Sequence, residues 1–208
     1  MRNFRLLFTS SLILSAAVSR AALFTFHGLV SGKSQAVSIN YAGNSMNVGA
    51  GLANVSLDGG PQFLGVCVDL DHWNGNGSSY QVNVRPIEDR GPFATRAAWL
   101  FNDQASSVNS NMKGAALQLA VWDIVYDNGD GLDAGSFKSS ASGSLLTQTN
   151  SYLAASFGNT SSNANWFQAV SHGNANNRNQ NYMGTVPEPS SIAVIAVGAF
   201  ALLRRRRR

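Results

Sequence analysis

The chain begins and ends with short apolar segments that lie beside arginines, and these segments limit the part that can fold into a domain. At the N-terminus, Arg2 and Arg5 precede an apolar run from Leu6 to Val18. Ser19-Arg20-Ala21 follows, with the small-x-small form of a signal peptidase site. We therefore expect a signal peptide at residues 1–21 that signal peptidase removes.

The C-terminus carries Pro187-Glu188-Pro189, an apolar run from Ile192 to Leu203, and five terminal arginines. As a helix, this run of about twelve residues rises only about 18 Å, against the roughly 30 Å of a bilayer core. The five positive charges are expected to stay in the cytoplasm. This order resembles the PEP-CTERM sorting signal of exported proteins from Gram-negative bacteria. The resemblance implies transient anchoring in the inner membrane through residues 186–208, and then cleavage near the motif by an exosortase, a membrane peptidase.

Residues 22–185 remain as the exported part, which is long enough for one domain that buries about two-thirds of its unfolded surface. The formal net charge of +4 is misleading, because the terminal segments hold eight of the fifteen basic residues. Without these and Glu188, seven basic and ten acidic residues remain, a net charge of −3. A basic nucleic-acid-binding surface is therefore not expected. Abundant Gly, Ser and Asn favour an extracellular β-rich domain with many turns.

Hydrophobic periodicity changes from β to α after Gly91-Pro92. The expected strands, separated by Gly, Asn and Asp, are 24–30, 36–41, 45–48, 52–57, 63–68 and 80–86. The expected helices are 95–102, 112–126 and 144–156, and segments 166–170 and 181–183 are expected to return as strands. The pattern predicts a β-rich α+β domain.

Cys67 is the one cysteine of the chain, and it lies between an apolar strand candidate and the acidic residues Asp69 and Asp71. Secreted proteins of this size usually contain cysteines in pairs. Three explanations of an unpaired cysteine are open: an inert buried thiol, an intermolecular disulfide, or a residue that is kept for its reactivity. Composition by itself favours the inert core thiol.

Gln118 is a polar residue on an apolar face of the expected 112–126 helix. Projection of this helix puts Lys113, Asp123 and Asp127 on one side, and Ala115, Val121, Trp122 and Val125 around Gln118 on the other. A buried amide without hydrogen bonds costs about 1–3 kcal/mol. We therefore expect Gln118 to hold a neighbouring loop or strand through backbone hydrogen bonds.

Two segments, Val66-Cys67-Val68-Asp69 and Leu117-Gln118-Leu119-Ala120-Val121-Trp122, together resemble the signature blocks of the thioester domain, the TQXA-type adhesin domain of bacterial surface proteins. The resemblance covers roughly residues 63–184, and Leu117 stands where the motif usually has threonine. It implies a β-barrel or sandwich with a small helical subdomain. It also implies that a late glutamine acylates Cys67, with Gln118, Trp122 and Asp69 as the supporting residues.

Two late glutamines are candidates for that bond. Gln180 lies just before the sorting tail, where the family places its glutamine, whereas Gln168 in Trp166-Phe167-Gln168-Ala169-Val170 has more apolar neighbours. We favour Gln180 and keep Gln168 as the alternative.

A cysteine thiolate that attacks a glutamine carboxamide releases ammonia and leaves an acyl group activated toward amines and hydroxyls, without a cofactor. Near-attack positioning replaces a strong base in this reaction. Water must be excluded, and Trp122, Trp99 and Tyr126 are the aromatic residues expected to exclude it.

Metal and enzyme sites have weaker support. The segment from Asp127 to Asp133 is rich in oxygen ligands and glycine, as calcium loops are, but it lacks the D-x-D-x-D-G spacing and a following glutamate, so an Asx-turn is favoured. Asp69, Asp71 and His72 have no second ligand cluster near them in the sequence. His27, His72 and His172 are scattered along the chain. We therefore predict no metal, no cofactor and no enzymatic turnover.

The leading hypothesis is an exported surface or matrix protein whose domain attaches covalently to an amine or hydroxyl of a partner, such as an extracellular polysaccharide. The alternative is a non-covalent structural or carbohydrate-binding β domain with an inert Cys67. A hydrolase is the third and weakest class.

Overall fold

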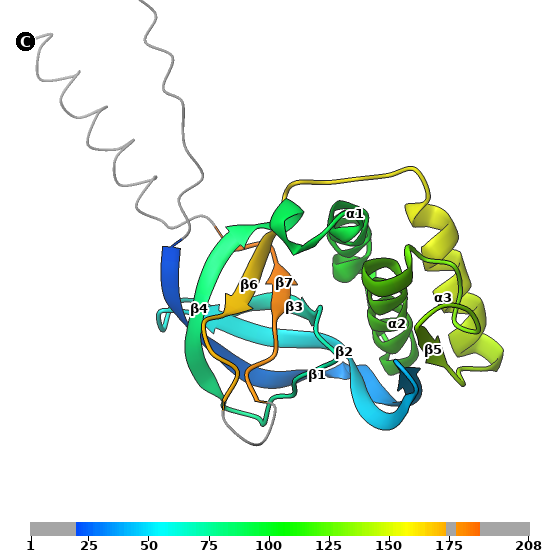
Figure 1. The fold of residues 1–208 in the computed structure, drawn as a ribbon, viewed down its shortest axis with the longest axis horizontal. Coiled ribbons are helices and arrows are strands. Elements are labelled where there is room, and N and C mark those ends of the chain that lie inside the picture. The colour runs from blue at the N-terminus through cyan, green and yellow to red at the C-terminus, as the bar shows by residue number, and fades with distance from the viewer. Residues whose placement is uncertain (1–19, 174–177, 188–208) are drawn as a thin grey trace, which may run out of the picture.

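The computed structural model describes residues 20–173 and 178–187, which form a mixed α+β domain (Figure 1). The strands are β1 (Arg20–Tyr41), β2 (Asn44–Leu57), β3 (Phe63–Cys67), β4 (Ser79–Pro86), β5 (Phe137–Ser139), β6 (Asn165–Ala169) and β7 (Tyr182–Gly184). The helices are α1 (Ala94–Gln104), α2 (Asn111–Asp127) and α3 (Gly143–Ser156), with short 3-10 helices at Ile87–Arg90 and Ala105–Ser107. The expected α+β class is confirmed, with the three helices gathered on one side of the strands.

All strand pairs are antiparallel, and the seven strands follow the order β2-β3-β7-β6-β4-β1-β5. Because β1 also pairs with β2, six of these strands close into a ring. The ring brings β7, near the end of the domain, beside β3, so that Tyr182 pairs with Cys67. Residues more than a hundred positions apart in the sequence therefore share one site.

Strands β1 and β2 are each longer than the sequence pattern indicated. The pattern divided β1 into 24–30 and 36–41, and β2 into 45–48 and 52–57, because glycines normally interrupt strands. Here the β1–β2 register shifts near Gly28 and again between Leu29 and Ser34, opposite Gly51. Gly32 and Gly51, at the second shift, have φ of 77° and 152°, so these glycines bend two continuous strands instead of ending them.

Helix α2 is the central element of the domain. Ser110 caps its N-terminus by accepting a hydrogen bond from the Lys113 N–H, and Asn128 ends it in the left-handed conformation. Gly114 allows the helix to approach β1, because a Cβ atom at this position would lie 1.9 Å from the Lys33 carbonyl oxygen. The helix packs on β1 and β2 with one side and on α1 and α3 with the other.

Two apolar clusters meet at α2. Ala116, Leu117 and Ala120 pack with α1 and the helical side, while Ala115, Leu119 and Trp122 pack with the aromatic residues inside the ring of strands. Every residue from 114 to 124 is buried. Asp123 is fully buried, although the helical projection placed it on the same side of α2 as Lys113. That side of the helix is therefore not a solvent-exposed face.

Candidate functional site

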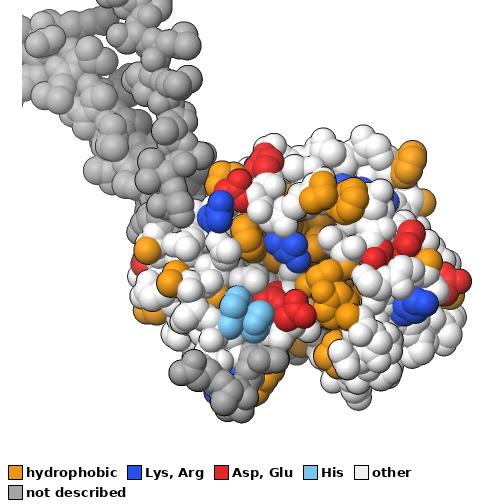
Figure 2. Space-filling view, viewed as in Figure 1, with side chains coloured by type: hydrophobic (Ala, Val, Ile, Leu, Met, Phe, Trp, Pro, Cys, Tyr) orange, Lys and Arg blue, Asp and Glu red, His pale blue; other side chains and the backbone are white. Residues whose placement is uncertain are grey.

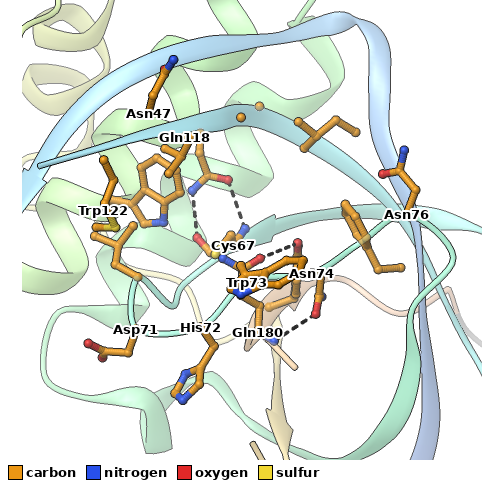
Figure 3. A pocket seen from close by; sticks show the side chains of 18 residues that line it. Asn47, Cys67, Asp71, His72, Trp73, Asn74, Asn76, Gln118, Trp122 and Gln180 are labelled. Carbon is orange, nitrogen blue, oxygen red and sulfur yellow. Dashed lines mark hydrogen bonds between the residues drawn. The ribbon is translucent and has the colours of Figure 1, made fainter. Parts of the chain in front are cut away.

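Cys67 ends β3 and lies beneath α2, at the base of a cavity of about 660 Å³. Figure 3 shows Gln118 and Gln180 approaching Cys67 from two sides. Trp122, Tyr182, Trp73 and the amides of Asn47, Asn74 and Asn76 also line this cavity. The thiol itself is buried, with Cys67 only 6% exposed.

Gln118 fixes the backbone of Cys67. Its Oε1 accepts from the Cys67 N–H at 3.0 Å, and its Nε2 donates to the Cys67 carbonyl at 2.8 Å. The side chain is 1% exposed, so both amide groups are satisfied inside the protein. This agrees with the expectation that a buried Gln118 holds a neighbouring strand.

The Cys67 thiol and the Gln180 carboxamide meet at one backbone oxygen. The thiol donates to the Asp69 carbonyl oxygen at 2.9 Å, and Gln180 Nε2 donates to the same oxygen at 3.2 Å. Cys67 Sγ and Gln180 Nε2 are therefore no farther apart than the sum of these distances, about 6 Å. The other carboxamide atom, Gln180 Oε1, accepts from the Tyr182 hydroxyl at 3.2 Å.

Asp69 connects the loop after β3 to the residues before β7. Its buried carboxylate accepts from the Asp71 N–H and from His72 Nδ1 on one side. On the other side, Oδ2 accepts from the Asn181 N–H at 3.1 Å and from Asn181 Nδ2 at 2.8 Å. Because Asn181 follows Gln180 directly, the Asp69 carboxylate sets the position of Gln180 relative to Cys67.

Burial, together with the nearby charge of Asp69, raises the pKa of the Cys67 thiol to about 12. The thiol is therefore neutral at physiological pH. The Trp122 indole N–H is close enough to lower this pKa, although its geometry is not that of a regular hydrogen bond and it has no other partner within the described part of the chain. Tyr126 packs against the apolar cluster that contains Cys67, and its hydroxyl accepts from the Leu70 N–H.

The structure does not bring every predicted residue to this site. Gln168 lies on β6, where its Oε1 accepts from Arg85, while its neighbours Phe167 and Ala169 are the buried ones. Because adjacent strand residues face opposite sides, Gln168 points away from Cys67. Trp99 packs against the helical cluster, whereas Cys67 belongs to the cluster inside the ring.

The histidines are less scattered than the sequence indicated. His72 and His172 stack with ring centroids 3.5 Å apart, beside acidic side chains on the face shown in Figure 2. His27 instead bonds the Ser56 hydroxyl. Sequence reasoning also missed the polar cavity wall formed by Asn47 on β2 and by Asn74 and Asn76 before β4, because single asparagines carry no periodic signal.

Residues 185–208 match the protein family of the PEP-CTERM protein-sorting motif. The chain ends in a PEP-CTERM sorting signal. This motif indicates an exported protein that exosortase processes for the cell surface. No curated protein and no solved structure matches the chain.

The PEP-CTERM match includes Pro187, which is exposed after β7, whereas Glu188, Pro189 and the expected membrane helix lie outside the described residues. The signal peptide prediction also falls mostly outside them, because the description begins at Arg20, the first residue of β1. Among the helices that are described, none is long and apolar enough to cross a membrane.

Proposed function

We propose that the exported domain forms an internal thioester between Cys67 and Gln180, and that this bond attaches the protein covalently to a partner at the cell surface or in the matrix. One observation carries the proposal: the thiol and the carboxamide both donate to the Asp69 carbonyl oxygen. The resemblance of the Cys67 and Gln118 segments to thioester adhesin domains supports it independently.

The reaction needs no external reagent. Cys67 Sγ bonds to the Gln180 carboxamide carbon, the carbon–nitrogen bond breaks, and the thiol proton leaves with the amide group as ammonia. An amine or hydroxyl of a partner then attacks the acyl carbon, forms an amide or ester with Gln180, and returns the proton to Cys67. Each domain reacts once, so this is attachment and not enzymatic turnover.

Positioning is the main contribution of the protein to this chemistry. The high pKa of Cys67 keeps the thiol protonated, so the reaction relies on proximity and not on a preformed thiolate. Gln118 holds the Cys67 backbone, and Asp69 holds Asn181 next to Gln180. The Tyr182 hydroxyl donates to Gln180 Oε1, the oxygen on which negative charge develops during attack.

Burial of Tyr182 supports its assignment as a hydrogen-bond donor. Its pKa lies well above the ordinary value, chiefly because the ring is buried, so the hydroxyl keeps its proton at physiological pH. A protonated phenol is the form that stabilises an oxyanion.

The side chains that line the cavity indicate which kind of partner could carry the nucleophile. Trp73 is a lining residue that is 47% exposed, and Asn47, Asn74 and Asn76 add amide groups to the lining. An aromatic ring with several amides suits the apolar face and hydroxyls of a saccharide. We therefore place extracellular polysaccharide, or an amine-bearing surface molecule, as the acceptor.

Intact mass of the purified protein tests the thioester directly. The bond lowers the mass by about 17 Da, the mass of ammonia, and methylamine should add about 31 Da to the thioester, giving a protein about 14 Da above the calculated mass with a free thiol. Gln180→Ala and Cys67→Ala should each abolish the deficit, while Gln168→Ala should leave it unchanged. The proposal would be refuted if wild-type protein had its full calculated mass. In that case Cys67 should also become open to alkylation on unfolding, without any treatment with an amine.

A non-covalent carbohydrate-binding module is the second candidate, and the high pKa of Cys67 favours it because such a thiol is unreactive. Polysaccharide binding that survives Cys67→Ala but is lost in Trp73→Ala would support this candidate. Binding that requires Cys67 and resists denaturation would support the covalent one.

A further inference from the structure

Three carboxylates gather at the C-terminal end of α2, away from the Cys67 site. Asp123 and Asp127 lie one turn apart on the helix, and Asp130 follows in the connecting loop. One carboxylate oxygen from each residue lies within 4.8 Å of the others. Like charges at this separation repel each other unless a cation or a proton compensates them.

Asp123 is the unusual member of this acidic cluster. Its side chain is fully buried, and Oδ2 accepts from the Gly131 N–H at 3.1 Å, which turns the carboxylate toward the loop that carries Asp130. Oδ1 is buried and has no hydrogen-bond partner among the residues described. A buried carboxylate oxygen without a partner is rare in proteins and calls for a ligand.

Arg96 is the nearby cation, but its donors are used elsewhere. Its guanidinium donates to the Asn128 and Leu153 carbonyls and to the Ser156 hydroxyl. These acceptors are neutral groups, and none of them is a carboxylate of the cluster. Among the described residues, Arg96 therefore forms no hydrogen bond that compensates the negative charge of the cluster.

Two further features favour a cation at this place. The carbonyl end of a helix carries partial negative charge, and α2 ends at Asp127. The loop beyond is already ordered around that residue, because Asp127 accepts from the Ser136 and Phe137 N–H groups and from the Ser136 hydroxyl. The ligand atoms are therefore held in place by the fold.

We propose that Asp123, Asp127 and Asp130 bind a calcium ion at the C-terminal end of α2. All three donors are hard carboxylate oxygens, which suit Ca²⁺ or Mg²⁺ and not softer metals. Calcium is the better match, because it accepts irregular coordination completed by water, whereas Mg²⁺ requires a near-octahedral set. The ion would join the end of α2 to the loop before β5, and it acts independently of any thioester.

Terbium luminescence provides a direct test on the full chain, purified in mild detergent and freed of metal with a chelator. Trp122 and Tyr126 are the sequence neighbours of Asp123 and Asp127, so excitation of these aromatic residues should sensitise bound Tb³⁺. Calcium should displace the signal with a dissociation constant of about 10⁻⁴ to 10⁻³ M, the range of extracellular sites. Calcium at about ten times that constant should raise the thermal midpoint by about 3–6 °C.

Asp123→Asn and Asp130→Asn should each weaken calcium binding at least tenfold and abolish the thermal shift. Asp130 is exposed, so its substitution should leave the fold intact even if Asp123→Asn disturbs it. Asp103→Asn is the matched control, because Asp103 is an exposed carboxylate on α1 outside the cluster. Unaltered binding in both cluster variants, absence of binding at millimolar calcium, or equal displacement by Mg²⁺ would overturn the proposal.

Discussion

Gln118→Leu should be one of the most destabilising single substitutions in this domain. Gln118 is the partner of both the N–H and the carbonyl of Cys67, and Cys67 is itself buried. Leucine has a similar volume but leaves both backbone groups without partners. Each unsatisfied buried group costs about 1–3 kcal/mol, and the added apolar surface offsets part of this, so we expect a net loss of about 2–4 kcal/mol. That is a large fraction of the 5–15 kcal/mol typical of a domain.

Urea denaturation measures this loss as a lower transition midpoint with an unchanged m-value. Gln148→Leu on α3 is the matched control, because Gln148 is a half-buried helical glutamine whose substitution should change stability by less than about 0.5 kcal/mol. A Gln118→Leu loss below about 1 kcal/mol, or equal to that of the control, would refute the reasoning. It would mean that Cys67 finds other backbone partners or water when the amide is removed.

Three further predictions follow from the site and the tail. Tyr182→Phe should slow recovery of the 17 Da mass deficit in refolded protein roughly tenfold, because it removes the donor to Gln180 Oε1, whereas Tyr152→Phe on α3 should not. In amine-treated protein, stability should fall as pH rises from 9.0 toward about 12, because folded Cys67 keeps a proton that the unfolded chain releases. Cys67→Ala should lack this part of the pH dependence. A urea midpoint that changes with pH in the same way in both proteins would contradict the prediction. Replacement of Pro187-Glu188-Pro189 by alanines should leave a membrane-retained precursor in the native host, and normal release of that protein, followed by immunoblotting, would disprove the role of the motif.

The strand pattern shows where local sequence reasoning reaches its limit. Alternation located most strands, but the segments around Gly32 and Gly51 were interpreted as breaks because a glycine's local preference does not reveal its pairing partner. In the fold, cross-strand hydrogen bonds on both sides carry β1 and β2 through these positions as bulges. The three-residue strand β5 was missed because it is defined by its pairing with the distant end of β1, which leaves no signal in the local sequence.

The sequence alone determined the sorting tail, the helical segment of α2 and the need of Gln118 for backbone partners. These features depend on local order, on 3.6-residue periodicity and on the satisfaction of a buried amide. Only the tertiary structure decided which late glutamine approaches Cys67. Pairing of β7 with β3 directs Gln180 to the Asp69 carbonyl, while β6 turns Gln168 toward Arg85. Burial of Asp123 was equally a tertiary outcome, because α2 packs between the strands and two other helices and has no solvent-facing side in its middle turns.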